Sequence, residues 1–451
     1  MEKKSGAKII QSLFDIANVP KEAQKILQDF DQIAQAALPA NSKQLVALPK
    51  IIRELSHQMT DDRGARRLGY MNEKTFLASY VRYFMWWNLV RLTRLFANLD
   101  FGFLRDGAVC LDIGSGPLTL PCALWLSRPD LRQKKLVWYV MDISQLALSL
   151  GEEIFLSVAA ATGGEPWKIV RVKGPLGTAV KEKAAFVTCA NMFNEILQSQ
   201  SEPPDFLAKK YSQALFKYLD FAEQASPAIF LAEPGVPKSA RFVSLMRDSF
   251  IRRGLLAVAP CPHQQNCPMD GRRAGQNGAN GKWCNFAFET DDAPRKLLAL
   301  SEKAGIPKER AVISFVYARA EAGSKPKTGG ARESVASPKS GVEQKGLASP
   351  RSGGLLRIAS DIIRVPAAEP GQKPRIGHYA CSEQGLVLAL SSGGRRVYSG
   401  DLVEIENAGK PKSGAARSGQ ERASGSRRDF GRDNSSRPQR DAKTGALIVE
   451  I

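Results

Sequence analysis

Short hydrophobic runs alternate with helical stretches over the middle of the chain. The candidate strands between residues 106 and 260 are AVCLDI, KLVWYVMD, WKIVRV, AAFVTCA and AIFLAEP, and AVISFVYARA follows further along. Strands separated by helices are typical of a parallel sheet with helices on its faces. We therefore predict an α/β fold with a Rossmann-like sheet over residues 101–320, interrupted by a cysteine-rich insertion at residues 259–290.

The flanking regions follow other patterns. Residues 1–100 mix apolar residues and arginines at helical spacing, which predicts a helical N-terminal region. Residues 321–354 are rich in Gly, Ser, Pro and Lys and predict a flexible linker. Residues 355–406 return to short β-like runs between turn residues, which predicts a small β domain. Residues 407–451 are rich in Arg, Gly and Ser and predict a basic, disordered tail.

The charge balance points to a polyanionic partner. The 451 residues include 64 Lys and Arg against 45 Asp and Glu, for a net charge of +19. A chain this basic usually meets nucleic acid or an acidic membrane surface, and the alternative is a solvated basic surface. Nucleic acid is favoured, because part of the excess is concentrated in the tracts predicted to be flexible.

The sequence also indicates where the protein works. Residues 1–27 have neither the apolar core of a secretory signal nor the acid-poor composition of a transit peptide. The apolar stretch 108–127 is nearly long enough to span a bilayer, but its Asp112, glycines and prolines predict a strand, a loop and a helix instead. We expect a soluble, cytoplasmic protein of bacterial type, without a transmembrane segment or a membrane partner.

Candidate nucleotide-binding residues follow the first strand of the sheet. VCLDIGSGPLTL places Asp112, Gly114 and Gly116 between a strand and a helix, where glycines let the backbone turn and approach a ligand. Asp142 ends the next strand, where a carboxylate can bind ribose hydroxyls. This pattern resembles the class I S-adenosylmethionine-dependent methyltransferases. The resemblance implies that the first acid and the glycines hold the methionine and adenosine side of the cofactor and that the second acid holds the ribose.

Two positions bear on this interpretation. The usual third glycine of the methyltransferase loop is Leu118 here, which leaves the detailed shape of the loop open. A nicotinamide-binding fold is the alternative, and it is disfavoured because the third glycine of that motif is Thr119.

Polar residues after the fourth strand are the candidates for the acceptor side of the site. In TCANMFNEIL, Asn191 is a candidate cofactor contact, and Asn194 and Glu195 are candidate catalytic residues. The Asn or Asp followed by two prolines and an aromatic residue, typical of amine methylation, is missing. Cys189 lacks the flanking prolines of cytosine methyltransferases, so we predict a buried thiol. Glu233 could shape the acceptor pocket or cap the following helix.

Four of the seven cysteines lie in turn-rich sequence. Their spacing is Cys261-x5-Cys267-x16-Cys284, with Cys381 far along the chain at the start of the predicted β domain. In a reducing compartment, clustered thiols favour a metal site over disulfides, and unrelated free thiols are the alternative. The spacing alone accepts an iron–sulfur cluster, zinc held by four cysteines, or zinc held by three cysteines and His263.

The cysteine pattern carries a second resemblance. The order APCPH…CP…WC, after LAEPG and before a late cysteine, is similar to the methyltransferase-like family of small-ribosomal-subunit assembly factors, which has mitochondrial and bacterial members. The similarity covers roughly residues 60–405. It implies a [4Fe–4S] cluster held by Cys261, Cys267, Cys284 and Cys381, which would fasten the β domain to the methyltransferase domain.

The same resemblance implies a function. The protein would be an assembly factor that binds the small ribosomal subunit and its rRNA, holds S-adenosylmethionine and is a monomer when free. The alternative is an active rRNA methyltransferase with a structural metal site, in which Asn194 and Glu195 lie near the acceptor. Radical chemistry is disfavoured, because radical enzymes carry three closely spaced cysteines that leave one iron open.

Overall fold

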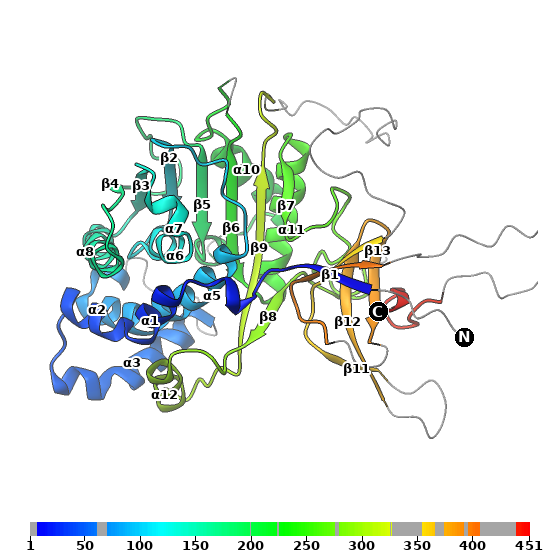
Figure 1. The fold of residues 1–451 in the computed structure, drawn as a ribbon, viewed down its shortest axis with the longest axis horizontal. Helices are drawn as coiled ribbons and strands as arrows, with labels where there is room; N and C mark the ends of the chain where they lie inside the picture. The colour runs from blue at the N-terminus through cyan, green and yellow to red at the C-terminus, as the bar shows by residue number, and fades with distance from the viewer. Residues whose placement is uncertain are drawn as a thin grey trace, which may run out of the picture.

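Two β-sheets organise the chain in the computed structural model (Figure 1). A large sheet with helices on both faces holds the middle of the sequence, and a second sheet lies beside it. The structure describes residues 7–60, 70–198, 200–222, 225–275, 279–324, 326, 354–365, 374–391, 396–405 and 439–451. Most of the predicted linker and of the predicted basic tail lies outside the described residues.

The large sheet has the predicted fold. Its strands are β2 (Val109–Ile113), β3 (Val137–Asp142), β4 (Lys168–Lys173), β5 (Phe186–Ala190), β6 (Ala228–Pro234), β7 (Leu256–Ala259), β8 (Phe286–Glu289) and β9 (Arg310–Arg319). The order is β4-β3-β2-β5-β6-β9-β7, with β8 paired to β9. Strands β2 to β6 are parallel, and β9 runs antiparallel to its neighbours β6, β7 and β8. The prediction of a class I methyltransferase Rossmann-like sheet is therefore confirmed. The cysteine-rich insertion at residues 259–290 follows β7, and its last part forms β8, a strand that the sequence did not predict.

The helices divide between the two faces of this sheet. The N-terminal part forms η1 (Ile16–Asn18), α1 (Lys21–Gln28), α2 (Phe30–Ala37), α3 (Ser42–Thr60), η3 (Tyr70–Asn72), α4 (Lys74–Ser79), the π-helical η4 (Tyr80–Met85) and α5 (Trp86–Ala97). The middle part forms α6 (Thr119–Ser127), α7 (Pro129–Arg132), α8 (Gln145–Thr162), α9 (Phe193–Ile196), α10 (Pro204–Phe216), α11 (Pro237–Arg252) and α12 (Arg295–Lys303).

Neighbouring strand residues feed two separate cores, because successive side chains point to opposite faces of a sheet. On one face, α5, α6 and α8 pack against residues such as Trp138 and Phe230. On the other face, α10 and α11 pack against residues such as Leu111 and Leu231. Helix α6 is buried all round, which explains the apolar length of the 108–127 stretch. No helix in the described ranges is long and apolar enough to cross a membrane.

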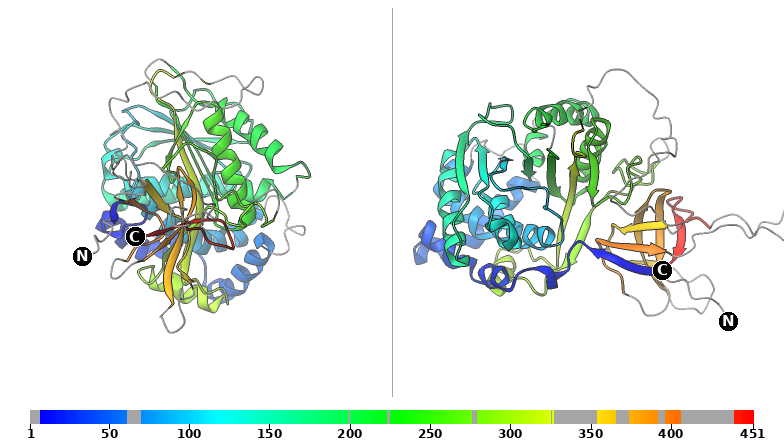
Figure 2. Two further views of the ribbon diagram at one scale, coloured as in Figure 1. Left: turned by 90° about the vertical axis from the view of Figure 1, so that its right-hand side faces the viewer. Right: turned by 45° about the horizontal axis from the view of Figure 1, so that its top comes forward.

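The second sheet gathers strands from both ends of the sequence. Its strands are β1 (Ala7–Ser12), β10 (Gly354–Ile358), β11 (Ile363–Val365), β12 (Arg375–Ser382), β13 (Gly385–Leu390), β14 (Asp401–Ile405) and β15 (Leu447–Glu450). Their order is β1-β14-β10-β12-β13-β15, with β11 paired to β12. Figure 2 shows β1 beside the other strands of this sheet, with the chain running from it to the N-terminal helices. Strands β1 and β15 depart from the predicted helical region and disordered tail, because partner strands supply the hydrogen bonds that hold them.

A buried guanidinium joins the two sheets. Arg357 on β10 is 2% exposed and donates three hydrogen bonds of 2.7 Å each. The acceptors are the carbonyl of Pro260 in the cysteine-rich insertion, the carbonyl of Gly400 before β14, and Oε1 of Gln11 on β1. Arg357 also pairs with Cys381 across β10 and β12. One side chain thus fixes three segments that are far apart in the sequence.

We expect Arg357→Lys to loosen this junction. A lysine keeps the charge but lacks the planar fork, so buried acceptors lose their partners at a cost of about 2–3 kcal/mol. Urea unfolding measures the loss of stability, and limited proteolysis locates it in residues 354–405. The control is Arg364→Lys on the exposed side of β11. Equal stability of the two variants would contradict the assigned role of Arg357.

Candidate functional site

The loop after β2 forms the centre of the candidate nucleotide site. Gly114 and Gly116 have φ values of +69° and +51°, and Leu118, which precedes α6, has a φ of +57°. A Cβ atom on Gly114 would lie 2.8 Å from Cβ of Met192, closer than real contacts allow. Glycine is therefore required at 114 both by the backbone and by the close approach of the β5–α9 turn. The left-handed turn at Leu118 shows how the loop forms without a third glycine.

Asp142 at the end of β3 fastens this loop. Its Oδ2 accepts a hydrogen bond of 2.9 Å from the amide of Gly116, and its Oδ1 accepts one of 2.8 Å from Ser144. Each carboxylate oxygen has a second acceptor site, so the group can still bind a hydroxyl. The Ser144 hydroxyl also lies 2.8 Å from Oδ1 of Asn72, which brings η3 against the loop.

Asp112 lies beneath the loop and is 2% exposed. Its two oxygens accept hydrogen bonds of 2.7 Å from the hydroxyls of Ser115 and Thr188. Burial raises the pKa of Asp112 to about 7, and the two hydroxyl donors oppose this rise. These contacts make Asp112 a group that holds the loop in place.

The turn after β5 is anchored by a carboxylate that the sequence did not assign to it. Asn191 has a φ of +59°, and its amide bonds to Ala232 on β6. Glu233, 1% exposed at the end of β6, accepts hydrogen bonds from the amides of Phe193 and Asn194 at 2.8 and 2.9 Å. Sequence analysis linked Glu233 to the acceptor pocket or to a cap of the following helix, and the structure shows it capping an earlier helix, α9.

The candidate catalytic residues lie on α9. Oδ1 of Asn194 is 3.2 Å from the hydroxyl of Ser239 on α11, and its amide is held by Glu233. Glu195 follows on the same short helix. Met192 brings this turn against Gly114. Through Met192, the turn that carries Asn191, Asn194 and Glu195 contacts the loop, and the chemical roles of these three residues remain predictions.

The four turn-region cysteines come together at the junction of the two sheets. Burial raises the pKa of the Cys381 thiol, and the charges of the Cys267, Cys261 and Cys284 thiolates raise it further, as neighbouring anions do. His263 Nε2 lies 2.9 Å from the Cys381 sulfur, and its buried Nδ1 has no partner among the described residues.

The junction lacks the finished geometry of a metal centre. In the described part of the chain, no three His, Cys, Asp or Glu side chains form a group that could hold a metal ion. The residues nevertheless fit a negatively charged centre, because two buried guanidinium groups lie beside the thiols. Arg247 on α11 is 3% exposed and donates to the Cys261 sulfur at 3.0 Å. Arg357 is the other, since the charges of Cys261, Cys284 and Cys381 act on it.

Arg247 and Arg357 are site residues that sequence reasoning missed, and it did not identify the partners of Glu233. The two arginines look like ordinary members of a basic sequence, and only the fold buries them. Glu233 was noticed at its strand end, but its partner amides belong to a turn 40 residues earlier.

Glu233 should make stability depend on pH. Burial raises the pKa of Glu233 from 4.5 to about 8, so between these values the folded protein binds a proton that the unfolded chain has released. Stability from this group is present at low pH and is lost as the pH rises through about 8. We expect the free energy of unfolding to fall by on the order of 3 kcal/mol, relative to Glu233→Gln, between about pH 5 and about pH 9. Urea unfolding of both proteins measures this difference, and parallel pH profiles would contradict it.

Comparison with solved structures finds methyltransferases with low sequence identity. Magnesium protoporphyrin IX methyltransferase from Synechocystis PCC 6803, with bound SAM, is 12% identical, with coverage of 61% of this chain and 97% of that one and a TM-score of 0.29. A SAM-dependent methyltransferase from Geobacter sulfurreducens, in complex with S-adenosyl-L-homocysteine, is 16% identical, with coverage of 53% and 90% and a TM-score of 0.27. Among curated proteins, none matches the chain.

The family comparison is more specific. The model of the family described as mitochondrial small ribosomal subunit Rsm22 matches residues 107–345, which is more than half of the chain. The matched region contains the β2 loop, the α9 turn and three of the four turn-region cysteines. The chain therefore belongs to the Rsm22 family of small-ribosomal-subunit proteins.

Proposed function

We propose that the protein is an assembly factor of the small ribosomal subunit that binds rRNA, holds S-adenosylmethionine and carries a [4Fe–4S] cluster. The observation that carries the proposal is the family match over residues 107–345, because it spans both the nucleotide loop and the cysteine-rich insertion. The net charge of +19 supports contact with rRNA, since phosphate neutralisation supplies much of the affinity for nucleic acids.

The β2 loop would hold S-adenosylmethionine, which supplies an electrophilic methyl group when it is bound. Gly114 and Gly116 give the loop its left-handed turns, and the carboxylate oxygens of Asp142 can accept further hydrogen bonds from ribose hydroxyls. Asn191 would contact the cofactor from the β5 turn. Asp112 would act indirectly, by holding Ser115 and Thr188 in place.

The four turn-region cysteines would hold the cluster as thiolates. A cluster or a zinc ion bound by four thiolates keeps a net negative charge, and burying it requires positive charge nearby. Arg247 and Arg357 supply that charge from opposite sides of the junction, one on α11 and one on β10. Because Cys381 comes from the second sheet and the other three from the insertion, the bound metal would link the two sheets.

Methyl transfer to rRNA is the second candidate function. Asn194 supports it, because Glu233 and Ser239 hold its backbone and side chain in a turn whose Met192 contacts Gly114 of the nucleotide loop. Labelled S-adenosylmethionine and immature small subunits decide between the two functions. Label in rRNA that is abolished by Asp142→Ala would establish the enzyme, and subunit binding without label would establish the assembly factor.

Metal analysis tests the cluster. Protein purified without oxygen should contain about four irons and four sulfides per chain, with a broad visible absorption. Ser substitutions at Cys261, Cys267, Cys284 or Cys381 should each remove most of the iron. The control is Cys122→Ala, a buried thiol on α6, which should retain the iron. One zinc per chain and no visible absorption would contradict the cluster and leave a metal-linked fold.

Calorimetric titration tests the nucleotide site. We expect Asp142→Ala to weaken binding of S-adenosylmethionine by at least about tenfold, because it removes the ribose acceptor and the anchor of the Gly116 amide. The control is Glu165→Ala in the exposed turn after α8. Unchanged affinity in Asp142→Ala would exclude this carboxylate from the site.

A further inference from the structure

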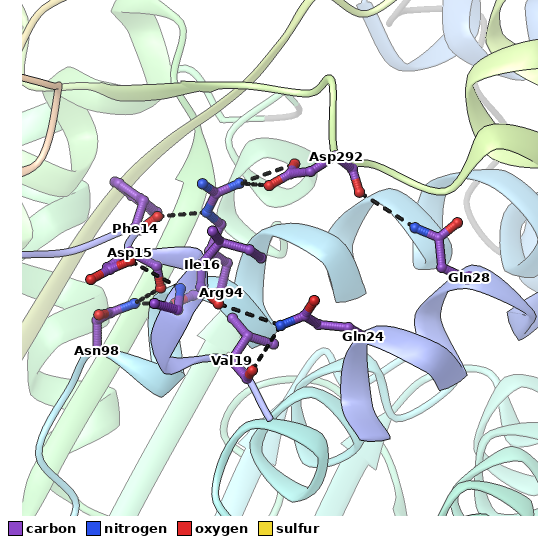
Figure 3. Close-up of polar contacts among 10 residues, drawn as sticks. Phe14, Asp15, Ile16, Val19, Gln24, Gln28, Arg94, Asn98 and Asp292 are labelled. Atoms are coloured by element: carbon purple, nitrogen blue, oxygen red, sulfur yellow. Dashed lines mark hydrogen bonds and ion pairs between the residues drawn. The ribbon is translucent and has the colours of Figure 1, made fainter. Parts of the chain in front are cut away.

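A cavity of about 520 Å³ lies where the N-terminal segment, the large sheet and the second sheet meet. Its walls come from the β1–η1 segment, from Arg94 on α5, from β8 and the loop after it, and from the loops around β14. Figure 3 shows the N-terminal side, where Arg94 donates to the carbonyl of Phe14 and contacts Asp292. The volume is that of a typical ligand site, and none of the predicted site residues lines it.

Exposed apolar side chains surround this cavity. Ile9 is 36% exposed, Ile16 37%, Ile362 42% and Tyr398 49%. They come from β1, from η1 and from two loops of the second sheet, so only the assembled fold brings them together. Apolar groups gathered around a cavity and left in water are typical of an interaction site.

The charges of the cavity are opposite to those of the whole chain. Six carboxylates line it, on Asp15, Glu289, Asp291, Asp292, Asp361 and Asp401. The three guanidinium groups that line it each contact one of them, as Arg94 with Asp292, Arg396 with Glu289, and Arg310 with Asp361. A fourth carboxylate, on Asp401, is buried and interacts with the guanidinium of Arg357. The surplus is therefore two exposed carboxylates, on Asp15 and Asp291, on a chain with a net charge of +19. This surplus repels phosphate and favours a cationic ligand.

We propose that this cavity is the docking site for a basic peptide segment of a partner protein. Aliphatic side chains of the segment cover Ile9, Ile16 and Ile362, and its arginines or lysines face the surplus carboxylates. A peptide is favoured over RNA because the lining carries negative charge and apolar groups together. This inference goes beyond the proposed function and does not depend on the cofactor or the cluster.

The position of the cavity couples peptide binding to the docking of the two sheets. Since both sheets line it, the segment binds only when the second sheet is docked against the large one. Binding therefore stabilises the docked arrangement, by the mass action that any ligand of one state exerts.

Fluorescence anisotropy on the full chain tests the proposal. The probe is a labelled nonapeptide with three arginines and three leucines, compared with an acidic peptide of equal length and a single-stranded RNA. We expect the basic peptide to bind and added salt to weaken it. Asp291→Lys reverses an exposed charge of the lining, and Ile362→Ser removes an exposed apolar side chain. Each should weaken binding about three- to tenfold.

Matched controls separate the cavity from general surface effects. Glu165→Lys makes the same charge change after α8, and Val46→Ser makes the same type of change on α3, where Val46 is 83% exposed. Neither control should change the affinity. Equal loss in controls and cavity variants, equal binding of the acidic peptide, displacement of the peptide from the cavity by RNA, or no binding of the basic peptide would each overturn the proposal.

Discussion

The arrangement of the two sheets depends on the buried guanidinium of Arg357. Its three hydrogen bonds go to neutral oxygens, two carbonyls and one amide oxygen, and not to a carboxylate. Burial lowers its pKa to about 10, and the charges of Cys261, Asp401 and two further cysteines oppose this fall. Removing such a charge from water is costly, and neutral acceptors offset only part of the cost. The site is therefore most stable when negative charge lies close by. The carboxylate of Asp401 supplies part of it, and the neighbouring cysteines add to it once they are deprotonated.

This requirement connects the junction to the cysteines. Arg357 on β10 is paired with Cys381 on β12. It also donates a hydrogen bond to the carbonyl of Pro260, the residue before Cys261. The contact that docks the second sheet thus also brings a thiol of β12 toward the thiols of the insertion. Arg247 approaches the same thiols from α11, so positive charge flanks them on two sides. The contacts of Arg357 that dock the second sheet therefore also position the cysteines.

The sequence predicted those parts of the molecule whose signals are local. Six strands of the large sheet, β2 to β6 and β9, were predicted because each is a short apolar run beside a helical stretch. The four-residue strands β7 and β8 were not predicted, because they border the cysteine-rich insertion and are held by pairing with β9. The loop glycines were predicted from their spacing, and they adopt a left-handed backbone. Strands β1 and β15 were not visible, because their hydrogen bonds come from β14 and β13 far along the chain. The same holds for Glu233 and Arg357, whose roles exist only through partners that folding brings to them.

The opposite charges of the surface and the cavity assign different partners to different parts of the molecule. In the proposed function, a net charge of +19 would give long-range attraction to rRNA without specifying one contact. The cavity is lined by paired arginines, surplus carboxylates and exposed isoleucines, and this combination excludes phosphate at short range. An assembly factor of a particle made of both RNA and protein needs both kinds of recognition. The cavity forms from the same docking contact that gathers the thiols, so a partner segment bound there and a metal bound by the cysteines would stabilise the same arrangement of the two sheets.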